Sequence, residues 1–161
     1  MKKLIAAAGL LALMTACGGG GGGGTPGDAV TGMFDALKAG DGEKAVSYMS
    51  ASALEEMDAQ LEMLKANPEA SAQQLALVGI EIDAEDIPGM TARDFAVAMI
   101  SSPMMMSVMS TAEVSIGEVT INGNAALVEV TTTVMGESET HTIDVVKEDG
   151  QWKVTEFGMN M

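Results

Sequence analysis

The chain has 161 residues, and its 8 Lys and Arg residues stand against 23 Asp and Glu residues, for a formal net charge of −15. This length allows one domain of ordinary size, and the negative charge excludes a nucleic-acid binder, because phosphate recognition needs clustered basic side chains. The single Cys excludes an intramolecular disulfide, a CxxC redox pair and a cysteine-based zinc site.

The first residues have the pattern of a secretory signal. Lys2 and Lys3 give a charged start, residues 4–14 form an apolar run, and Thr15 and Ala16 are small. A helix that spans a membrane needs about 20 apolar residues, so this run is too short for a permanent span. We predict that residues 1–16 are a signal peptide that is removed on export.

Residues 13–17 resemble the lipobox of bacterial lipoproteins, in which the Cys receives a diacylglycerol and the freed amine is acylated. Met14 stands where that family usually has Leu. The resemblance implies that Cys17 is lipidated and that its acyl chains anchor the protein to a membrane of the bacterial cell envelope. Gly18 replaces the Asp that commonly retains lipoproteins at the inner membrane, so we expect the outer membrane if the host has one. The alternative is an ordinary cleaved signal with an incidental Cys.

Residues 17–27 are predicted to be the lipidated Cys and a glycine-rich tether. Residues 18–24 are all glycine, and polyglycine has no side chain to bury, so we expect a flexible coil. About ten such residues have a root-mean-square reach of about 17 Å. The folded domain is then expected over residues 28–161.

The first half of this domain has helical periodicity. Apolar residues recur at spacings of three and four, with Asp28 as a cap, Gly40 as a stop, and capping boxes at 52–55 and 91–94. The predicted helices lie at about residues 28–40, 41–49, 52–67, around 75–78, 91–102 and 103–109. Ser102 is expected to cap the last of these, because Pro103 suits a first helical position.

From residue 111 onward the apolar period changes to two. The predicted strands lie at about 111–121, 126–134, 140–147 and 152–159, with turns at 122–124, 136–138 and 148–150. A phase slip at Gly117–Glu118 predicts a bulge in the first strand. Consecutive hairpins give a curved four-stranded antiparallel meander that buries one face on the helices, so the fold class is α+β.

Three phrases, at residues 33–41, 119–128 and 146–154, are similar to the opening helices and closing hairpins of nuclear transport factor 2-like proteins. The similarity covers about residues 27–160. Within this family, the chain resembles most a domain of unknown function that occurs in bacterial lipoproteins. The resemblance implies a curved sheet that wraps around helices to form a cone. Some relatives are ketosteroid isomerases or small dehydratases, and many others bind or assemble. No residue here matches their catalytic positions, so we assign no catalytic residue.

Three side chains are candidates for ligand binding in such a cone. His141 is the only histidine, and an imidazole can act as an acid or a base near neutral pH. Tyr48 and Trp152 could line the cone and donate hydrogen bonds. Each has an ordinary alternative, because a single His with no identified partner is often structural, and Tyr and Trp often anchor a core.

No cofactor or resident metal is expected. Met104, Met105 and Met106 could offer soft sulfur ligands to Cu(I), but adjacent helical residues point about 100° apart, and Met also fills gaps in a core. The acidic stretch 81–86 lacks the order of an EF-hand loop, so we interpret it as a solvated surface.

These observations lead to one functional hypothesis and two alternatives. We expect a lipid-anchored, non-enzymatic envelope domain that binds a small apolar ligand or a protein partner, with a homodimer through the sheet face as one arrangement. The first alternative is an isomerase-like or dehydratase-like enzyme that uses the cone. The second is a Met-based copper binder.

Overall fold

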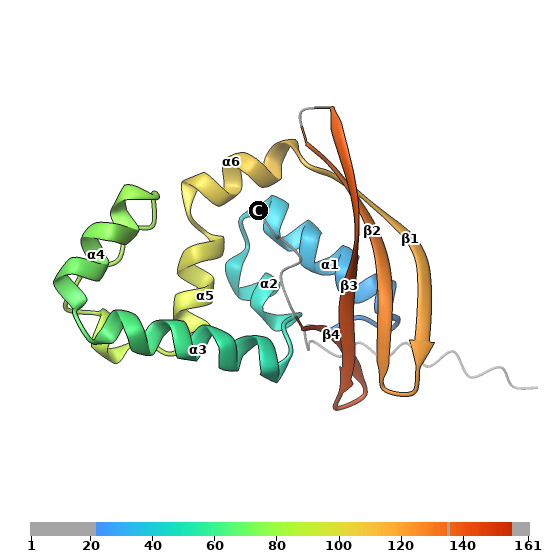
Figure 1. The fold of residues 1–161 in the computed structure, drawn as a ribbon, viewed down its shortest axis with the longest axis horizontal. Helices are drawn as coiled ribbons and strands as arrows, with labels where there is room; N and C mark the ends of the chain where they lie inside the picture. The colour runs from blue at the N-terminus through green and yellow to red at the C-terminus, as the bar shows by residue number, and fades with distance from the viewer. Residues whose placement is uncertain (1–21, 135, 156–161) are drawn as a thin grey trace, which may run out of the picture.

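The computed structural model describes residues 22–134 and 136–155, and its helices precede its strands along the chain (Figure 1). The predicted signal peptide and Cys17 lie outside the described residues. Among the residues that are described, no helix is both long enough and apolar enough to cross a bilayer. The elements are α1 (Pro26–Ala39), α2 (Gly42–Ser47), α3 (Ala51–Lys65), α4 (Pro68–Leu77), the short 3-10 helix η1 (Ile87–Gly89), α5 (Ala92–Ile100), α6 (Pro103–Thr111), β1 (Glu113–Asn122), β2 (Ala125–Val134), β3 (Glu137–Glu148) and β4 (Gln151–Val154).

The α+β prediction is confirmed, and the sheet is a simple meander. The strands pair in the order β1-β2-β3-β4, and each pair is antiparallel. The register shifts by one residue between Ile116 and Val119, so the predicted bulge is confirmed. β3 begins at Glu137, earlier than the predicted 140, because Val134 and Glu137 pair across a tight turn in which Gly136 has a φ of 88°. The predicted extension of the last strand beyond residue 155 lies outside the described residues.

The start of α1 differs from the sequence prediction. Thr25 is the N-cap, and Asp28 is the third helical residue of a capping box: the Asp28 amide donates to the Thr25 hydroxyl, and the Thr25 amide donates to the Asp28 carboxylate. Because the box also uses Pro26 at the first helical position, the helix begins inside the predicted tether. The predicted end at Gly40 is confirmed, since this residue has the left-handed φ of 67° typical of a helix stop.

The start of α3 is also corrected. Ser50, rather than Ser52, is the N-cap, and its hydroxyl accepts a hydrogen bond from the amide of Ala53. The reason is tertiary: the Ser50 amide donates to the carbonyl of Val154 in β4, which holds this buried residue in an extended conformation. The capping box at Thr91 and the Ser102 cap of α6 are confirmed as predicted.

Two of the predicted tether glycines are part of the fold. Gly23 forms an isolated antiparallel bridge with Trp152, in which the Gly23 amide donates to the Trp152 carbonyl at 3.2 Å and the Gly23 carbonyl accepts from the Trp152 amide at 3.1 Å. The prediction of flexible coil is therefore wrong for Gly23, because the backbone at the edge of β4 forms two hydrogen bonds with it.

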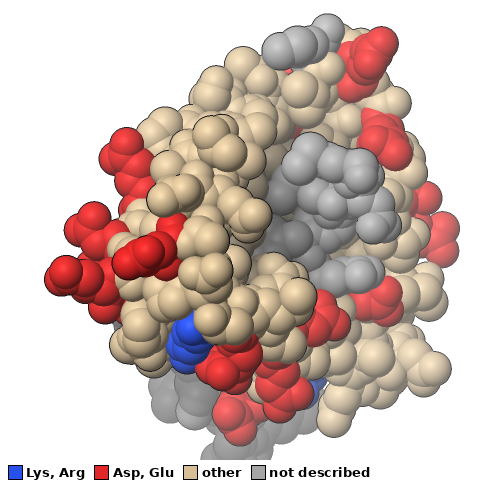
Figure 2. Space-filling view, turned by 60° about the vertical axis from the view of Figure 1, so that its left-hand side comes forward, with Lys and Arg blue, Asp and Glu red and all other residues tan. Residues whose placement is uncertain are grey.

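Over residues 22–134 and 136–155, the buried hydrophobic residues form two clusters. The main core lies between the inner face of the sheet and α1, which contacts all four strands, and it includes residues of α2, α5 and α6. A smaller cluster around Leu61, Ile87 and Phe95 joins α3, η1 and α5. Figure 1 accordingly shows α3, α4 and α5 as a lobe on the side of α1 and α2 that is remote from the sheet. Asp and Glu side chains are spread over the surface seen in Figure 2, with little basic surface between them.

Candidate ligand-binding face

The inner face of the sheet is apolar except at a few positions. Residues that pair directly across antiparallel strands project to the same face, so the register defines this face, and its buried members in β2 and β3 include Val128, Val130 and Ile143. Val119 and Ile121 of β1 share it, as their alternation predicts, but lie exposed near the sheet edge. A polar side chain on this face therefore lies among apolar neighbours and needs a hydrogen-bond partner.

Two polar atoms on the inner face lack hydrogen bonds. Thr132 Oγ1 and His141 Nε2 are both buried, and neither has a hydrogen-bond partner among the described residues. Val130 pairs with His141 and Thr132 pairs with Glu139, so Thr132 and His141 are diagonal neighbours on adjacent strands. Diagonal neighbours lie about 7–8 Å apart, which allows one small molecule to contact both side chains.

The unpartnered atoms are unusual because most buried polar groups in proteins are hydrogen-bonded. Leaving one buried without a partner costs about 1–3 kcal/mol. The pair therefore marks a place where a bound molecule could recover free energy by offering a hydrogen-bond donor or acceptor.

Tyr48 has a packing role. A Cβ atom built on Gly32 of α1 would lie 2.4 Å from the hydroxyl oxygen of Tyr48 and the ring carbon that bears it, so the ring lies directly against α1. Its backbone carbonyl accepts a hydrogen bond from the amide of Val154 at 2.8 Å. Tyr48 thus connects α1, the end of α2 and β4, and nothing places it beside His141.

Trp152 lies at the other end of the inner face. Its side chain is only 5% exposed, and the Lys147 ammonium lies 5.7 Å from the ring centroid. Trp152 pairs with Lys147, which is six residues from His141 along β3. At about 3.3–3.4 Å per residue, His141 and Trp152 are about 20 Å apart, so the three predicted site residues do not form one site.

Thr132 is a candidate residue that the sequence prediction did not name. The alternation of β2 assigns Thr131 and Thr133 to the outer face, and this assignment is confirmed by the hydroxyl pairs Thr131–Thr140 and Thr133–Ser138. A polar residue between two outward-facing threonines must project inward. The position of Thr132 between these two threonines was therefore a signal in the sequence. Its position next to His141 follows only from the register of β2 and β3.

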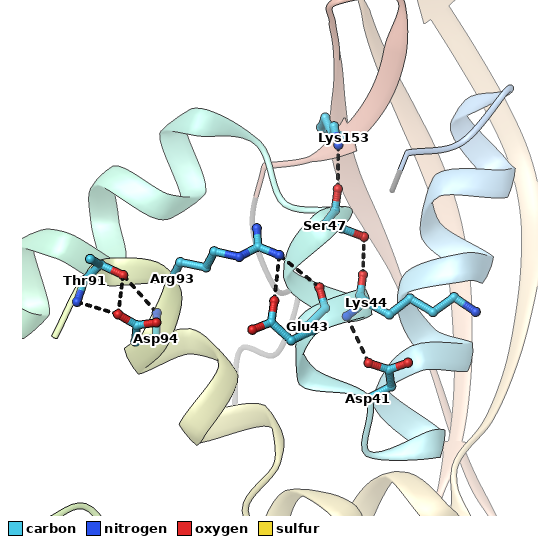
Figure 3. Close-up of polar contacts among 8 residues, drawn as sticks. All are labelled: Asp41, Glu43, Lys44, Ser47, Thr91, Arg93, Asp94 and Lys153. Atoms are coloured by element: carbon cyan, nitrogen blue, oxygen red, sulfur yellow. Dashed lines mark hydrogen bonds and ion pairs between the residues drawn. The ribbon is translucent and has the colours of Figure 1, made fainter. Parts of the chain in front are cut away.

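A separate set of polar contacts joins the helices to one another and to β4 (Figure 3). Arg93 of α5 contacts the Glu43 carboxylate at 2.9 Å and also donates to the Glu43 carbonyl, which ties α5 to α2. Lys153 of β4 donates to the carbonyl of Ser47, and burial is the main cause that lowers the pKa of this ammonium. Because these bonds go to caps, backbone carbonyls and exposed partners, we interpret them as connections between elements.

The three adjacent methionines have different surroundings. Met104 is 56% exposed beside Gly79, Met105 packs against the main core, and the sulfur of Met106 lies over Gly40. Within residues 22–134 and 136–155, no group of three or more His, Cys, Asp or Glu side chains could hold a metal ion.

Helices packed on one face of a four-stranded antiparallel meander form the α+β arrangement that the resemblance to nuclear transport factor 2-like proteins implies. A family model described as "Putative lumazine-binding" matches residues 68–156, more than half of the chain, and the chain belongs to that family. A solved structure from Campylobacter jejuni, described as "Putative NTF2-like transpeptidase", is 17% identical with a TM-score of 0.43, over 82% of this chain and 98% of that one. A search of curated proteins gave no match.

Proposed function

We propose that this protein is a lipid-anchored component of the bacterial cell envelope whose domain binds a small, largely apolar ligand without transforming it. The ligand contacts the inner face of the sheet at Thr132 and His141. The observation that supports this proposal is the pair of buried polar atoms without partners among the described residues, on a face whose other buried members are apolar. Membership of a family whose description names lumazine binding agrees with a ligand-binding role.

The chemistry of the face suggests the class of ligand. Val114 and Val134, which are only partly buried and flank Thr132 on the inner face, offer apolar surface, whereas Thr132 and His141 offer one hydroxyl and one ring nitrogen. A hydroxyl can donate or accept, and the imidazole nitrogen does one or the other according to its tautomer. A flat ring system with hydrogen-bonding atoms along one edge satisfies both groups and buries its faces on the aliphatic side chains. Lumazine, a fused heteroaromatic ring system edged with nitrogen and oxygen, is of this class and is the first probe.

The enzymatic alternative would use the carboxylate nearest to this pair in the register. Glu139 pairs with Thr132 and lies two residues from His141 on the same strand, but its side chain is exposed and does not bond to Thr132 Oγ1 or His141 Nε2. A base acts efficiently when a partner orients it or shifts its pKa toward the working pH. Since Glu139 is exposed and bonded to neither Thr132 nor His141, we expect Glu139→Gln to leave ligand affinity unchanged.

The binding proposal is tested by titrating lumazine into the full chain in detergent and following ligand fluorescence anisotropy. His141→Leu removes one ligand hydrogen bond, so affinity should fall about 2- to 13-fold, the equivalent of about 0.5–1.5 kcal/mol. Thr142→Val, on the outer face of the same strand, is the matched control and should bind like the wild type. Equal affinity in His141→Leu and the wild type would contradict the assigned site.

The anchor is tested by metabolic labelling with radioactive palmitate. The lipobox resemblance at residues 13–17 supports acylation at Cys17, and Cys17→Ala should abolish the label and release the protein from the membrane fraction. Labelling that persists in Cys17→Ala would contradict the anchor.

A further inference from the structure

Gly23, near the end of the glycine run, is held at one end of the sheet. Gly23 is buried, and its two backbone hydrogen bonds to Trp152 extend the sheet by one residue beyond β4. Gly22 lies close to the side chain of Gln151. The described part of the fold thus includes residues 22 and 23, which precede α1.

Only glycine fits these two positions. A Cβ atom on Gly23 would lie 2.1 Å from the backbone nitrogen of Ala29, and one on Gly22 would lie 2.7 Å from the Cβ atom of Gln151. A Cβ atom on Gly24, by contrast, would lie 3.6 Å from an Asp28 carboxylate oxygen, which is an ordinary contact. The absence of side chains at 22 and 23 is thus a packing requirement, and residue 24 provides a built-in comparison.

This docking shortens the distance between the proposed anchor and the sheet. A fully extended chain spans at most about 3.6 Å per residue, so Cys17 and Gly22 are separated by at most about 18 Å. If the tether were free as far as residue 27, the same limit would be about 36 Å. The docked glycines therefore halve the maximum separation.

The two ends of the sheet differ in charge. The turns 122–124 and 148–150 lie at the end where Gly23 docks, and the hairpin 147–153 there balances Lys147 and Lys153 against Glu148 and Asp149. The opposite end carries acidic side chains, Glu113, Glu137 and Glu139, and no basic residue in the described parts of those strand ends. An acidic surface gains nothing from an anionic bilayer, whereas a neutral end can approach it.

We propose that the docked glycines orient the domain, so that the end of the sheet with turns 122–124 and 148–150 faces the lipid headgroups. Trp152 then lies close to the bilayer, and Thr132 and His141 lie farther out, toward the aqueous side. This inference depends on the lipid anchor of the proposed function. The partner of this surface is the bilayer itself rather than another protein.

Trp152 is the only tryptophan of the chain, so its fluorescence reports this orientation directly. The acylated full-length protein is reconstituted in phosphatidylcholine vesicles that carry a nitroxide on the lipid headgroup, and quenching of Trp152 is measured. Wild type and Gly24→Ala should be quenched equally. Gly23→Ala, which clashes with α1, should lose most of the quenching because the tether no longer docks.

A second variant separates release of the tether from damage to the fold. Ten Gly-Ser residues inserted after Gly20 leave the docked glycines intact and lengthen the span to the anchor by about 36 Å. This insertion should also lose most of the quenching, with unchanged thermal unfolding. Equal quenching of the wild type and the insertion variant, or an unquenched wild type with confirmed acyl mass, would overturn the orientation. A purified protein without acyl mass would instead overturn the anchor.

Discussion

Replacing Thr132 with Val should stabilise the ligand-free protein. Val has nearly the shape of Thr and a similar preference for strands, so the substitution exchanges the unpartnered hydroxyl for a methyl group. The buried hydroxyl costs about 1–3 kcal/mol because it lost its hydrogen bonds to water and gained none in the fold. Domains of this size shift by about 2–8 °C per kcal/mol, so the melting temperature should rise by at least about 2 °C.

Thermal unfolding followed by circular dichroism measures this change, with Thr131→Val as the matched control. Thr131 is next in sequence, lies on the outer face, and shares a hydrogen bond of 2.8 Å with Thr140. Loss of such a cross-strand pair costs about 0.2–1 kcal/mol, so this control should melt at the same or a lower temperature. If Thr132→Val also lowered the melting temperature, the hydroxyl would have a stabilising partner and the reasoning would be refuted.

Three further predictions test the packing and the caps. Gly42→Ala should lower the free energy of unfolding in urea by about 1–3 kcal/mol, because its Cβ would lie 2.9 Å from a backbone carbonyl oxygen of α5. Gly27→Ala, whose Cβ would have 3.6 Å of clearance, should instead raise this free energy by up to about 1 kcal/mol. An unchanged stability of Gly42→Ala would contradict the close contact of α2 and α5. Leu61→Ala should cost about 2–5 kcal/mol, because this side chain is 0% exposed in the second cluster, and a loss below about 0.5 kcal/mol would mean that the cluster contributes little. Hydrogen bonds from Thr91 lower the pKa of Asp94. The stabilising effect of Asp94 is therefore present above the ordinary aspartate pKa of about 4 and is lost as the pH falls through the lowered pKa. Acid titration of stability should show this loss in the wild type and not in Asp94→Asn.

Local signals in the sequence predicted most of the fold. The phase slip at Gly117 predicted the bulge, because a period of two must break when one extra residue enters a strand. The capping box at Thr91 and the left-handed stop at Gly40 involve residues within a few positions of each other. Such features depend on nearby atoms alone, and for that reason a single sequence contains enough information to place them.

The features that the sequence did not predict depend on distant partners. Ser50 caps α3 because β4 holds its backbone, and Gly23 docks because the same strand has a free edge. No pattern in the neighbouring sequence predicts either contact, because Ser50 and Gly23 each stand among other small residues. In the same way, His141 was a candidate by residue type, but its relation to Thr132 followed only from the register of β2 and β3.

We propose that a ligand fills the hydrogen-bonding capacity of His141 and Thr132 on the inner face. Since His141 is the only histidine, its imidazole nitrogens can be assigned without ambiguity by nitrogen-15 NMR of the full chain in detergent. Addition of lumazine should shift the Nε2 resonance and saturate, and Thr132→Val should weaken the titration by about 2- to 13-fold. An Nε2 resonance that does not move while lumazine is bound would contradict the claim.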